Sequence, residues 1–222
     1  MATAFFNVTS PFGNLTGWEA QNDNPSTSRD RAQALGADGD ETASKTYNAK
    51  TSVSATYVLK SKTGCKIPKF GEILEGYHVD SVSIKFTNTG FVSMDITGHK
   101  HGTNSHPACR TYTGSLTTIA NEFGCPSSVP GMTIPTNAGV RSVTYTLTGN
   151  HVDEPNSTGD FLAAENYDGH ETVDCELCDT GTITAGSGWD LVTDSHGRGN
   201  TSAETSSASV EKHIAHDSAS ST

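Results

Sequence analysis

The sequence predicts a mainly β protein: an antiparallel two-sheet β-sandwich or barrel with one flanking α-helix, at about 115–123, and extended polar terminal arms. Three observations predict this class. Apolar and polar residues alternate with a period of two in several segments after residue 51, glycine and asparagine mark the turns between those segments, and one segment among them has helical spacing. Period-two alternation is typical of antiparallel strands that bury one face.

Residues 1–50 are predicted to form an N-terminal extended arm. Four aromatic residues precede its polar tract: Phe5, Phe6, Phe12 and Trp18. Aromatic residues spaced along a polar arm are typical of anchors for a groove, on the same subunit or on a neighbour, and we predict these four as inter-subunit anchors. The segment from Ser28 to Leu35, closed by Gly36, has the signals of a short capped helix.

Residues 51–216 are predicted to form the β-sandwich domain, and residues 217–222 a polar C-terminal tail. The clearest alternating segments are 53–59, 82–86, 92–96, 143–147, 173–177 and 208–214. The turn at residues 87–90 contains asparagine and glycine, as a hairpin requires. We therefore expect antiparallel strands joined by short turns.

The segment 115–123 has the pattern of an amphipathic helix. Ser115 is a suitable N-cap, and Gly124 and Pro126 are suitable terminators. The apolar positions recur at i, i+3, i+4 and i+7, and they are Leu116, Ile119, Ala120 and Phe123. With a single apolar stripe, this helix is expected to lie across one face of a sheet.

The net charge of −11 is concentrated in one interval, residues 142–197, which contains no Lys or Arg. Its acidic residues are Asp153, Glu154, Asp160, Glu165, Asp168, Glu171, Asp174, Glu176, Asp179, Asp190 and Asp194. A fold that collects them on one side has a negative field, which repels polyanions and attracts cations. No basic, aromatic-rich stripe indicates a surface that holds nucleic acid.

The composition also limits the class of protein. With 222 residues the chain fits one domain with arms, but only 33% of the residues are apolar and 7% aromatic, so some burial is expected between subunits. No run approaches the length of a membrane span and no signal peptide is recognisable, so no membrane partner is predicted. Five cysteines at scattered spacing argue against a disulfide framework.

The sharpest local cluster of chemically capable residues contains His99, His101 and His106. A His-x-His pair on a strand places both imidazoles on one face, which suits zinc or another transition metal. The pair resembles part of the cupin metal motif, but Asn104 and Ser105 stand where that motif needs a glutamate. The competing interpretation is a polar loop or an inter-subunit contact. The prediction is therefore no metal, with these histidines as the candidate ligands.

Two further patterns are candidate ion sites. Cys175 and Cys178 have the spacing of a zinc or redox half-site, but no second such pair exists, and on a strand positions i and i+3 point to opposite faces. The acidic loop 151–160 has oxygen ligands suited to calcium, without EF-hand spacing. The competing interpretation for each is a buried or solvated residue without an ion.

No motif for nucleophilic catalysis, phosphate binding or zinc proteolysis is present. The sequence therefore predicts a protein that is not an enzyme and needs no cofactor. A metalloenzyme centred on His99, His101 and His106 remains an alternative, which metal analysis of untagged protein would test.

Several stretches resemble the bacteriophage major tail protein family, whose members are tail tube subunits. These stretches are residues 76–86, 91–101, 141–151 and 159–164. The resemblance implies two packed sheets and hexameric rings that stack into a hollow tube in the virion tail, after synthesis in the host cytoplasm. It also implies three partners: further copies of the chain, other virion tail proteins, and DNA as transient, non-adhesive cargo.

An acidic face suits a lumen through which DNA slides without sticking, because it offers no phosphate neutralisation. The candidate lumen residues are Asp153, Glu154, Asp160, Glu165, Asp168, Glu171, Asp174, Glu176 and Asp179. The alternative function is a β-sandwich binding or decoration module that recognises carbohydrate or calcium on a virion or secreted surface. Rings or tubes of purified protein would favour the tail tube, and a monomer stabilised by calcium would favour the binding module.

Overall fold

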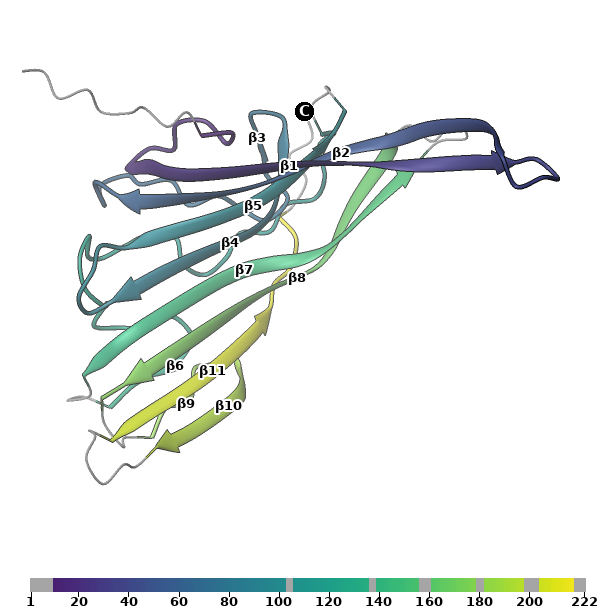
Figure 1. Ribbon diagram of the computed structural model, residues 1–222. Coiled ribbons are helices and arrows are strands. Elements are labelled where there is room, and N and C mark those ends of the chain that lie inside the picture. The colour runs from purple at the N-terminus through teal and green to yellow at the C-terminus, as the bar shows by residue number, and fades with distance from the viewer. Residues whose placement is uncertain are drawn as a thin grey trace, which may run out of the picture.

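The protein, seen as a computed structural model, is built around one large antiparallel sheet (Figure 1). The structure describes residues 10–102, 106–135, 139–155, 161–178, 182–197 and 204–217. The sheet has nine strands in the order β1-β2-β5-β4-β7-β8-β11-β10, with β3 added beside β4, and β6 and β9 form a separate two-stranded sheet. The strands are β1 (Trp18–Leu35), β2 (Glu41–Leu59), β3 (Ile73–Leu74), β4 (Tyr77–Thr87), β5 (Ser93–His101), β6 (Met132–Thr133), β7 (Val140–Pro155), β8 (Phe161–Leu177), β9 (Thr184–Ala185), β10 (Asp190–Gly197) and β11 (Thr205–His213).

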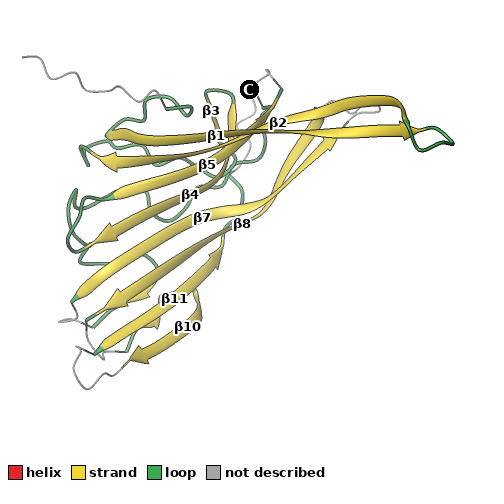
Figure 2. Cartoon of the chain, viewed as in Figure 1, coloured by secondary structure: helices red, strands yellow, loops and turns green. Residues whose placement is uncertain are grey.

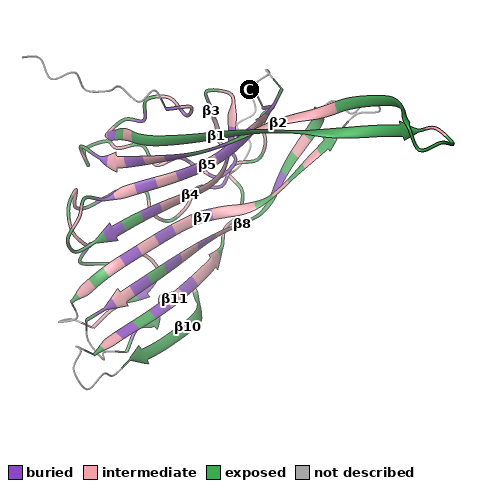
Figure 3. Cartoon of the chain, in the orientation of Figure 1, coloured by how far each residue is buried: buried purple, intermediate pink, exposed green. Residues whose placement is uncertain are grey.

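The prediction of a mainly β, antiparallel protein is confirmed. Buried and partly exposed residues alternate along the central strands β4, β5, β7 and β8, as Figure 3 shows. Val82, Ile84 and Phe86 of β4 lie on the buried face, while Ser83 and Lys85 lie on the other. This period of two is what the apolar spacing of the sequence requires of a strand with one covered face.

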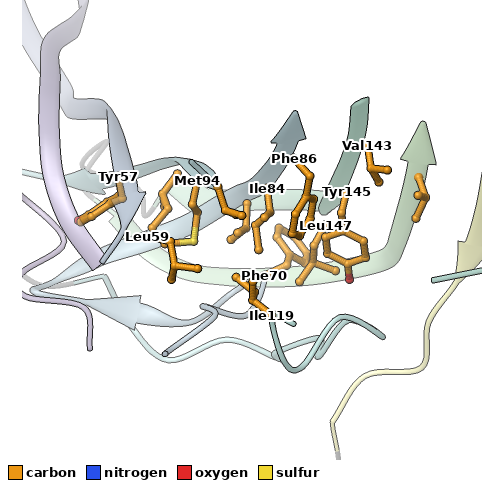
Figure 4. Packing of buried hydrophobic residues seen from close by; sticks show 14 of the residues in the cluster. Tyr57, Leu59, Phe70, Ile84, Phe86, Met94, Ile119, Val143, Tyr145 and Leu147 are labelled. Atoms are coloured by element: carbon orange, nitrogen blue, oxygen red, sulfur yellow. The ribbon is translucent and has the colours of Figure 1, made fainter. Parts of the chain in front are cut away.

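Segments outside the large sheet cover its apolar face. Phe70 and Ile119 come from such segments and pack against the strand residues Leu147 and Ile84 in the core (Figure 4). Phe12 and Tyr112, also from outside the strands, are buried in the same cluster. The architecture therefore fits a β-sandwich in which loops and the small sheet β6–β9 make the second layer.

The predicted helix at 115–123 is wrong, and none of the described residues is helical (Figure 2). Ser115 does not cap a helix, because its backbone N–H donates to Glu171 Oε2 at 2.6 Å and its hydroxyl donates to Glu171 Oε1. The other end of the segment is held by the Val92 N–H, which donates to the carbonyl of Glu122 at 3.0 Å. Long-range hydrogen bonds thus replace the helical ones. It follows that no helix suited to crossing a membrane occurs in the described part of the chain.

The short helix predicted from Ser28 to Leu35 is also wrong, since these residues belong to β1. Their backbone pairs antiparallel with β2, from Ser28 opposite Lys50 to Leu35 opposite Glu41. Arg31 and Gln33 both donate to the Glu41 carboxylate across the hairpin. Cross-strand contacts of this kind override the local capping signals.

Two hairpin arms project beyond the body of the sheet (Figure 1). The first, arm A, is the part of β1 and β2 between residues 28 and 49, beyond the start of β5 pairing at Lys50. The second, arm B, is the part of β7 and β8 formed by residues 149–155 and 161–169, beyond the pairing with β4 and β11. Each arm leaves the sheet at a β-bulge that contains a residue with positive φ, Asn48 at 50° and Asp168 at 53°.

Candidate functional site

Five histidines gather between the sheet and the root of arm B. His78 lies on β4, His99 and His101 on β5, His106 in the segment after β5, and His151 on β7. Neighbouring rings are separated by 4.2 to 6.1 Å between centroids. Such a concentration of imidazoles is unusual for a site without chemical function.

Strand geometry explains how residues distant in the sequence meet here. His99 and His101 alternate with Lys100 on β5, so both imidazoles project from the same face of the strand, as predicted. His78 pairs directly with His99 across the β4–β5 ladder. The His106 N–H donates to the carbonyl of Gly76 at 2.9 Å, which fixes the next segment over the cluster.

Asp153, on arm B, lies at the centre of the cluster. Its Oδ1 is 2.6 Å from His151 Nε2 and 3.4 Å from His106 Nε2. Its Oδ2 is 2.9 Å from His101 Nε2 and 3.3 Å from His99 Nε2. One carboxylate therefore faces four imidazoles, which come from three different segments of the chain.

A second layer of polar groups orients the rings. Asp80 accepts hydrogen bonds from Nδ1 of His78 at 2.8 Å and from Nδ1 of His99 at 2.8 Å. The Asn166 amide donates from Nδ2 to the Arg110 carbonyl at 2.7 Å, so its Oδ1 faces the histidines. That oxygen lies 2.9 Å from His78 Nε2 and 2.6 Å from His151 Nδ1.

The environment shifts the pKa values of these groups. Burial raises the pKa of Asp80, but hydrogen bonds from His78 and His99 lower it more, to about 2. Burial likewise raises the pKa of Asp153, but hydrogen bonds with the surrounding histidines lower it by more. The net pKa of Asp153 is therefore well below its usual range. Both carboxylates are therefore ionised at neutral pH.

The histidines respond differently from one another. Burial lowers the pKa of His78 and of His101, which favours their neutral forms. Burial also lowers the pKa of His99, but its contacts with the Asp153 and Asp80 carboxylates raise it more. The Lys50 ammonium, 3.5 Å from Asp153 Oδ2, adds a positive charge at the edge of the cluster. These pKa shifts favour the neutral forms of His78 and His101 and the charged form of His99.

The sequence identified three members of this cluster and missed the others. His99, His101 and His106 were the predicted metal candidates, and the structure brings them together. His78 and His151 lie on other strands, and Asp153 was predicted only as one acid among many. A weak signal existed for His151, because the Thr-Gly that precedes His99 recurs just before it at Thr148 and Gly149.

The predicted acidic residues do not share one environment. Asp153 belongs to the histidine cluster, and Glu171 is fully buried, so neither is part of an exposed acidic face of this chain. Exposed or partly exposed positions are held by Glu154, Glu165, Asp168, Asp174 and Glu176, whereas Asp160 and Asp179 lie outside the described residues. Two of the exposed carboxylates form ion pairs, Glu165 with Arg110 at 3.2 Å and Glu176 with Arg141 at 2.9 Å.

The predicted aromatic anchors that the structure describes are buried in this chain. Phe12 is 2% exposed, and its ring meets Tyr77 edge to face at 5.8 Å. Trp18 is 8% exposed, and its indole N–H donates to the carbonyl of Lys66 at 2.8 Å. Both side chains are thus accounted for without a neighbouring subunit, while Phe5 and Phe6 lie outside the described residues.

The two further ion-site patterns gain no support. Cys175 is buried whereas Cys178 is exposed, and both are free thiols. In the acidic loop 151–160, His151 and Asp153 contact each other, and residues 156–160 lie outside the described part of the chain.

Comparison with known proteins identifies no family for this chain. No protein-family model matches its sequence, and no curated protein matches it either. The functional conclusion therefore depends on the residues and surfaces described above.

Proposed function

We propose that the protein is a virion structural protein whose copies self-assemble into stacked rings, six subunits to a ring, that form a phage tail tube. The observation that carries this proposal is the location of the exposed apolar side chains. Six of the eight large hydrophobic residues that are exposed in the described part of the chain lie on the two arms or on an edge strand. They are Leu35, Val152, Leu162, Tyr167, Leu191 and Val192.

Apolar side chains on projecting hairpins and sheet edges are typical of surfaces that another chain covers. Leu35 is 64% exposed at the end of arm A, and Leu162 is 65% exposed on arm B. On arm B, Val152, Ala163 and Tyr167 line a hollow in the surface. A second copy of the chain, offering its own arm or edge, supplies the matching apolar surface.

The sheet edges favour head-to-tail association. In the described residues β1 pairs only with β2 and β10 only with β11, so each edge strand leaves one row of backbone groups for another chain. Because the two edges are different strands, pairing of β1 of one copy with β10 of the next is heterologous. Heterologous contacts generate closed rings or open filaments, and rings are the building units of a tube.

Arm A needs a partner for its own stability. From residue 28 to residue 35 the arm consists of two strands that pair only with each other, and its side chains are exposed on both faces (Figure 3). At about 3.4 Å per residue these eight positions reach about 27 Å beyond the sheet. Isolated two-stranded hairpins are marginally stable in water, so an arm of this length supports docking on a neighbouring subunit.

The sheet face opposite the core has the chemistry of a lumen wall. On β7, β8 and β11 it carries small polar residues with acids among them, and it includes Ser142, Thr144, Asp174, Glu176 and Ser209. Such a wall offers DNA few positively charged and few apolar side chains to contact, so DNA passes without binding. We assign the lumen role to Asp174 and Glu176 in preference to the buried acids.

The test is the oligomeric state of the purified, untagged full chain by multi-angle light scattering and negative-stain electron microscopy. Rings or tubes support the proposal. A monomer that persists at high concentration contradicts it, and a monomer whose melting temperature rises with calcium supports the alternative binding module.

A pair of variants links assembly to the edge strand β10. Leu191→Asp places a charge in the proposed contact and is expected to leave a folded monomer. Thr193→Asp adds the same charge on the same strand without removing an apolar side chain, and it is expected to assemble like the parent. Equal assembly of parent and Leu191→Asp would exclude this edge from the interface.

A further inference from the structure

We propose that His99, His101, His106 and Asp153 bind one divalent transition-metal ion, with Zn²⁺ as the ion that their donor atoms fit best. The proposal is independent of the proposed assembly, because all four ligands belong to the same chain. Three of the ligands are imidazoles and the fourth is a carboxylate. Their exposed fractions are small: 1%, 8% and 4% for the histidines, and 19% for the Asp153 side chain.

The spacing of the donor atoms matches a small cation. A tetrahedral ion with ligands at about 2.0–2.1 Å holds its donor atoms about 3.3 Å apart. The Nε2 atoms of His99 and His106 lie 3.3 and 3.4 Å from the Asp153 oxygens, and that of His101 lies 2.9 Å away. The donor atoms of the four residues all lie within 4.8 Å of one another. Each of the four side chains thus brings one donor atom within reach of a single small cation.

The orientation of the rings directs lone pairs to that point. His99 Nδ1 donates to Asp80 and His106 Nδ1 donates to the Pro107 carbonyl at 2.9 Å, so these nitrogens carry the protons. In a neutral imidazole the other nitrogen, Nε2, then carries a lone pair, and here it faces the Asp153 carboxylate. Two electron-rich atoms in this arrangement repel each other unless a proton or a metal cation lies between them. Metal-binding histidines commonly have this type of hydrogen bond on the other nitrogen.

His99 provides a second, independent observation. Its side chain is 2% exposed, and its Nε2 makes no hydrogen bond to any described residue, although Asp153 Oδ2 is 3.3 Å away. A buried polar atom without a hydrogen bond is costly and needs an explanation. A metal–nitrogen bond satisfies this atom.

The donor set selects the class of ion and its role. Imidazole with carboxylate is a ligand set for zinc and similar transition metals, whereas calcium and magnesium prefer oxygen ligands throughout. Four protein ligands in a buried site are typical of structural zinc, since catalytic sites keep one position open. The ion would join β5, the segment after it and arm B, and would thereby fasten the root of arm B to the sheet.

Two neighbouring sets of residues are rival sites, and in one of them, His78, Asp80 and His99, both histidines already contact the Asp80 carboxylate at 2.8 Å. His78, Cys109 and His151 also place donor atoms within 4.8 Å of one another. However, both ring nitrogens of His78 and of His151 already lie within 2.9 Å of carboxylate or amide oxygens. We therefore assign these two histidines to the layer that supports the ligands.

The experiment uses the full chain, purified without a polyhistidine tag and stripped with a chelator. Titration with Zn²⁺ is expected to bind one ion per chain and to raise the melting temperature. Titration with Co²⁺ is expected to give the absorption of a tetrahedral site without a thiolate charge-transfer band. His99→Ala combined with His101→Ala should abolish stoichiometric binding. His170→Ala combined with His213→Ala removes another pair of neighbouring rings, 6.1 Å apart, and should leave binding unchanged.

Three results would overturn the assignment. One is the absence of stoichiometric uptake of Zn²⁺ and Co²⁺ by the parent protein. Another is a thiolate band in the Co²⁺ spectrum, which would move the ion to the site containing Cys109. The third is unchanged binding in a folded His99→Ala, His101→Ala variant. If that variant does not fold, the stoichiometry and the Co²⁺ spectrum of the parent protein decide the question.

Discussion

Replacing the buried carboxylate of Glu171 should weaken the fold more than replacing any exposed acid. Glu171 is fully buried on β8 and accepts hydrogen bonds from the Ser115 N–H at 2.6 Å, from the Ser115 hydroxyl, and from the Tyr145 hydroxyl at 2.6 Å. Burial, and then the Glu171 carboxylate, raise the pKa of Tyr145, so its hydroxyl stays protonated and donates. A Cβ on Gly114 would overlap the Tyr145 hydroxyl, so the loop approaches the sheet closely here.

The size of the loss in the free energy of unfolding follows from the hydrogen-bond donors that lose their acceptor. Glu171→Ala removes the acceptor of three donors, and each buried donor left without a partner costs about 1–3 kcal/mol. We expect a loss of about 3–5 kcal/mol in the free energy of unfolding, a large part of the roughly 5–15 kcal/mol of a typical domain. Glu171→Gln keeps the shape and one acceptor oxygen, so about 1–2 kcal/mol is expected.

The assay is urea unfolding followed by tryptophan fluorescence. With a slope of about 2 kcal/mol/M, Glu171→Ala should lower the midpoint by about 2 M. The matched control is Glu176→Ala on the same strand, whose ion pair with Arg141 is about half exposed on both sides and should contribute less than about 1 kcal/mol. A Glu171→Ala midpoint equal to that of Glu176→Ala would refute the role of this carboxylate.

Three further changes have defined outcomes. Asp80→Asn removes the carboxylate that holds His99 Nδ1, and it should weaken zinc binding about 10–100-fold in competition with a chelator. Phe12→Ala empties a core position that is 2% exposed, and it should lower the free energy of unfolding by about 3–5 kcal/mol in urea. Burial raises the pKa of Asp217, but hydrogen bonds from Lys69, Thr113 and Thr111 lower it more, so the net pKa is lowered. The stabilisation it provides is present above its unfolded pKa of about 3.9 and is lost as the pH falls toward the folded value. Asp217→Asn should therefore destabilise the protein at pH 7, and the difference from the parent should vanish in acid.

Each of these predictions can fail clearly. Zinc affinity unchanged by Asp80→Asn would mean that this carboxylate does not support the ligand. A loss below about 1 kcal/mol for Phe12→Ala would mean that the N-terminal segment does not belong to the core. A stability difference for Asp217→Asn that persists in acid would show that its contacts with Lys69 and Thr111 do not depend on its charge.

The strands could be predicted from the sequence, because the alternating pattern that identifies each strand lies within its own residues. In β4 the apolar residues Val82, Ile84 and Phe86 alternate with polar ones, and any chain with this pattern buries one face of a strand. The segment 115–123 was mispredicted for the opposite reason. Its helical spacing is real, but its polar backbone groups are satisfied by Glu171 and by the β4–β5 turn, and these partners are distant in the sequence.

The candidate site likewise contains residues that the sequence could predict and residues that it could not. His99, His101 and His106 are neighbours in the sequence, and the His-x-His spacing placed two of them on one face. His78 joins them only through the register between β4 and β5, and Asp153 only through the course of arm B. Composition alone cannot distinguish Asp153 from the other acids of its interval, because its role is set by the four imidazoles around it.

Asn48 and Asp168 give the two arms a property that the core does not share. At each of these positions a left-handed backbone conformation, which asparagine and aspartate tolerate, lies in the bulge where a hairpin leaves the body. A substitution there is expected to change the course of a hairpin more than the buried apolar contacts of the sheet, since neither residue belongs to the core. The directions of arm A and arm B therefore depend on other residues than those that form the hydrophobic core.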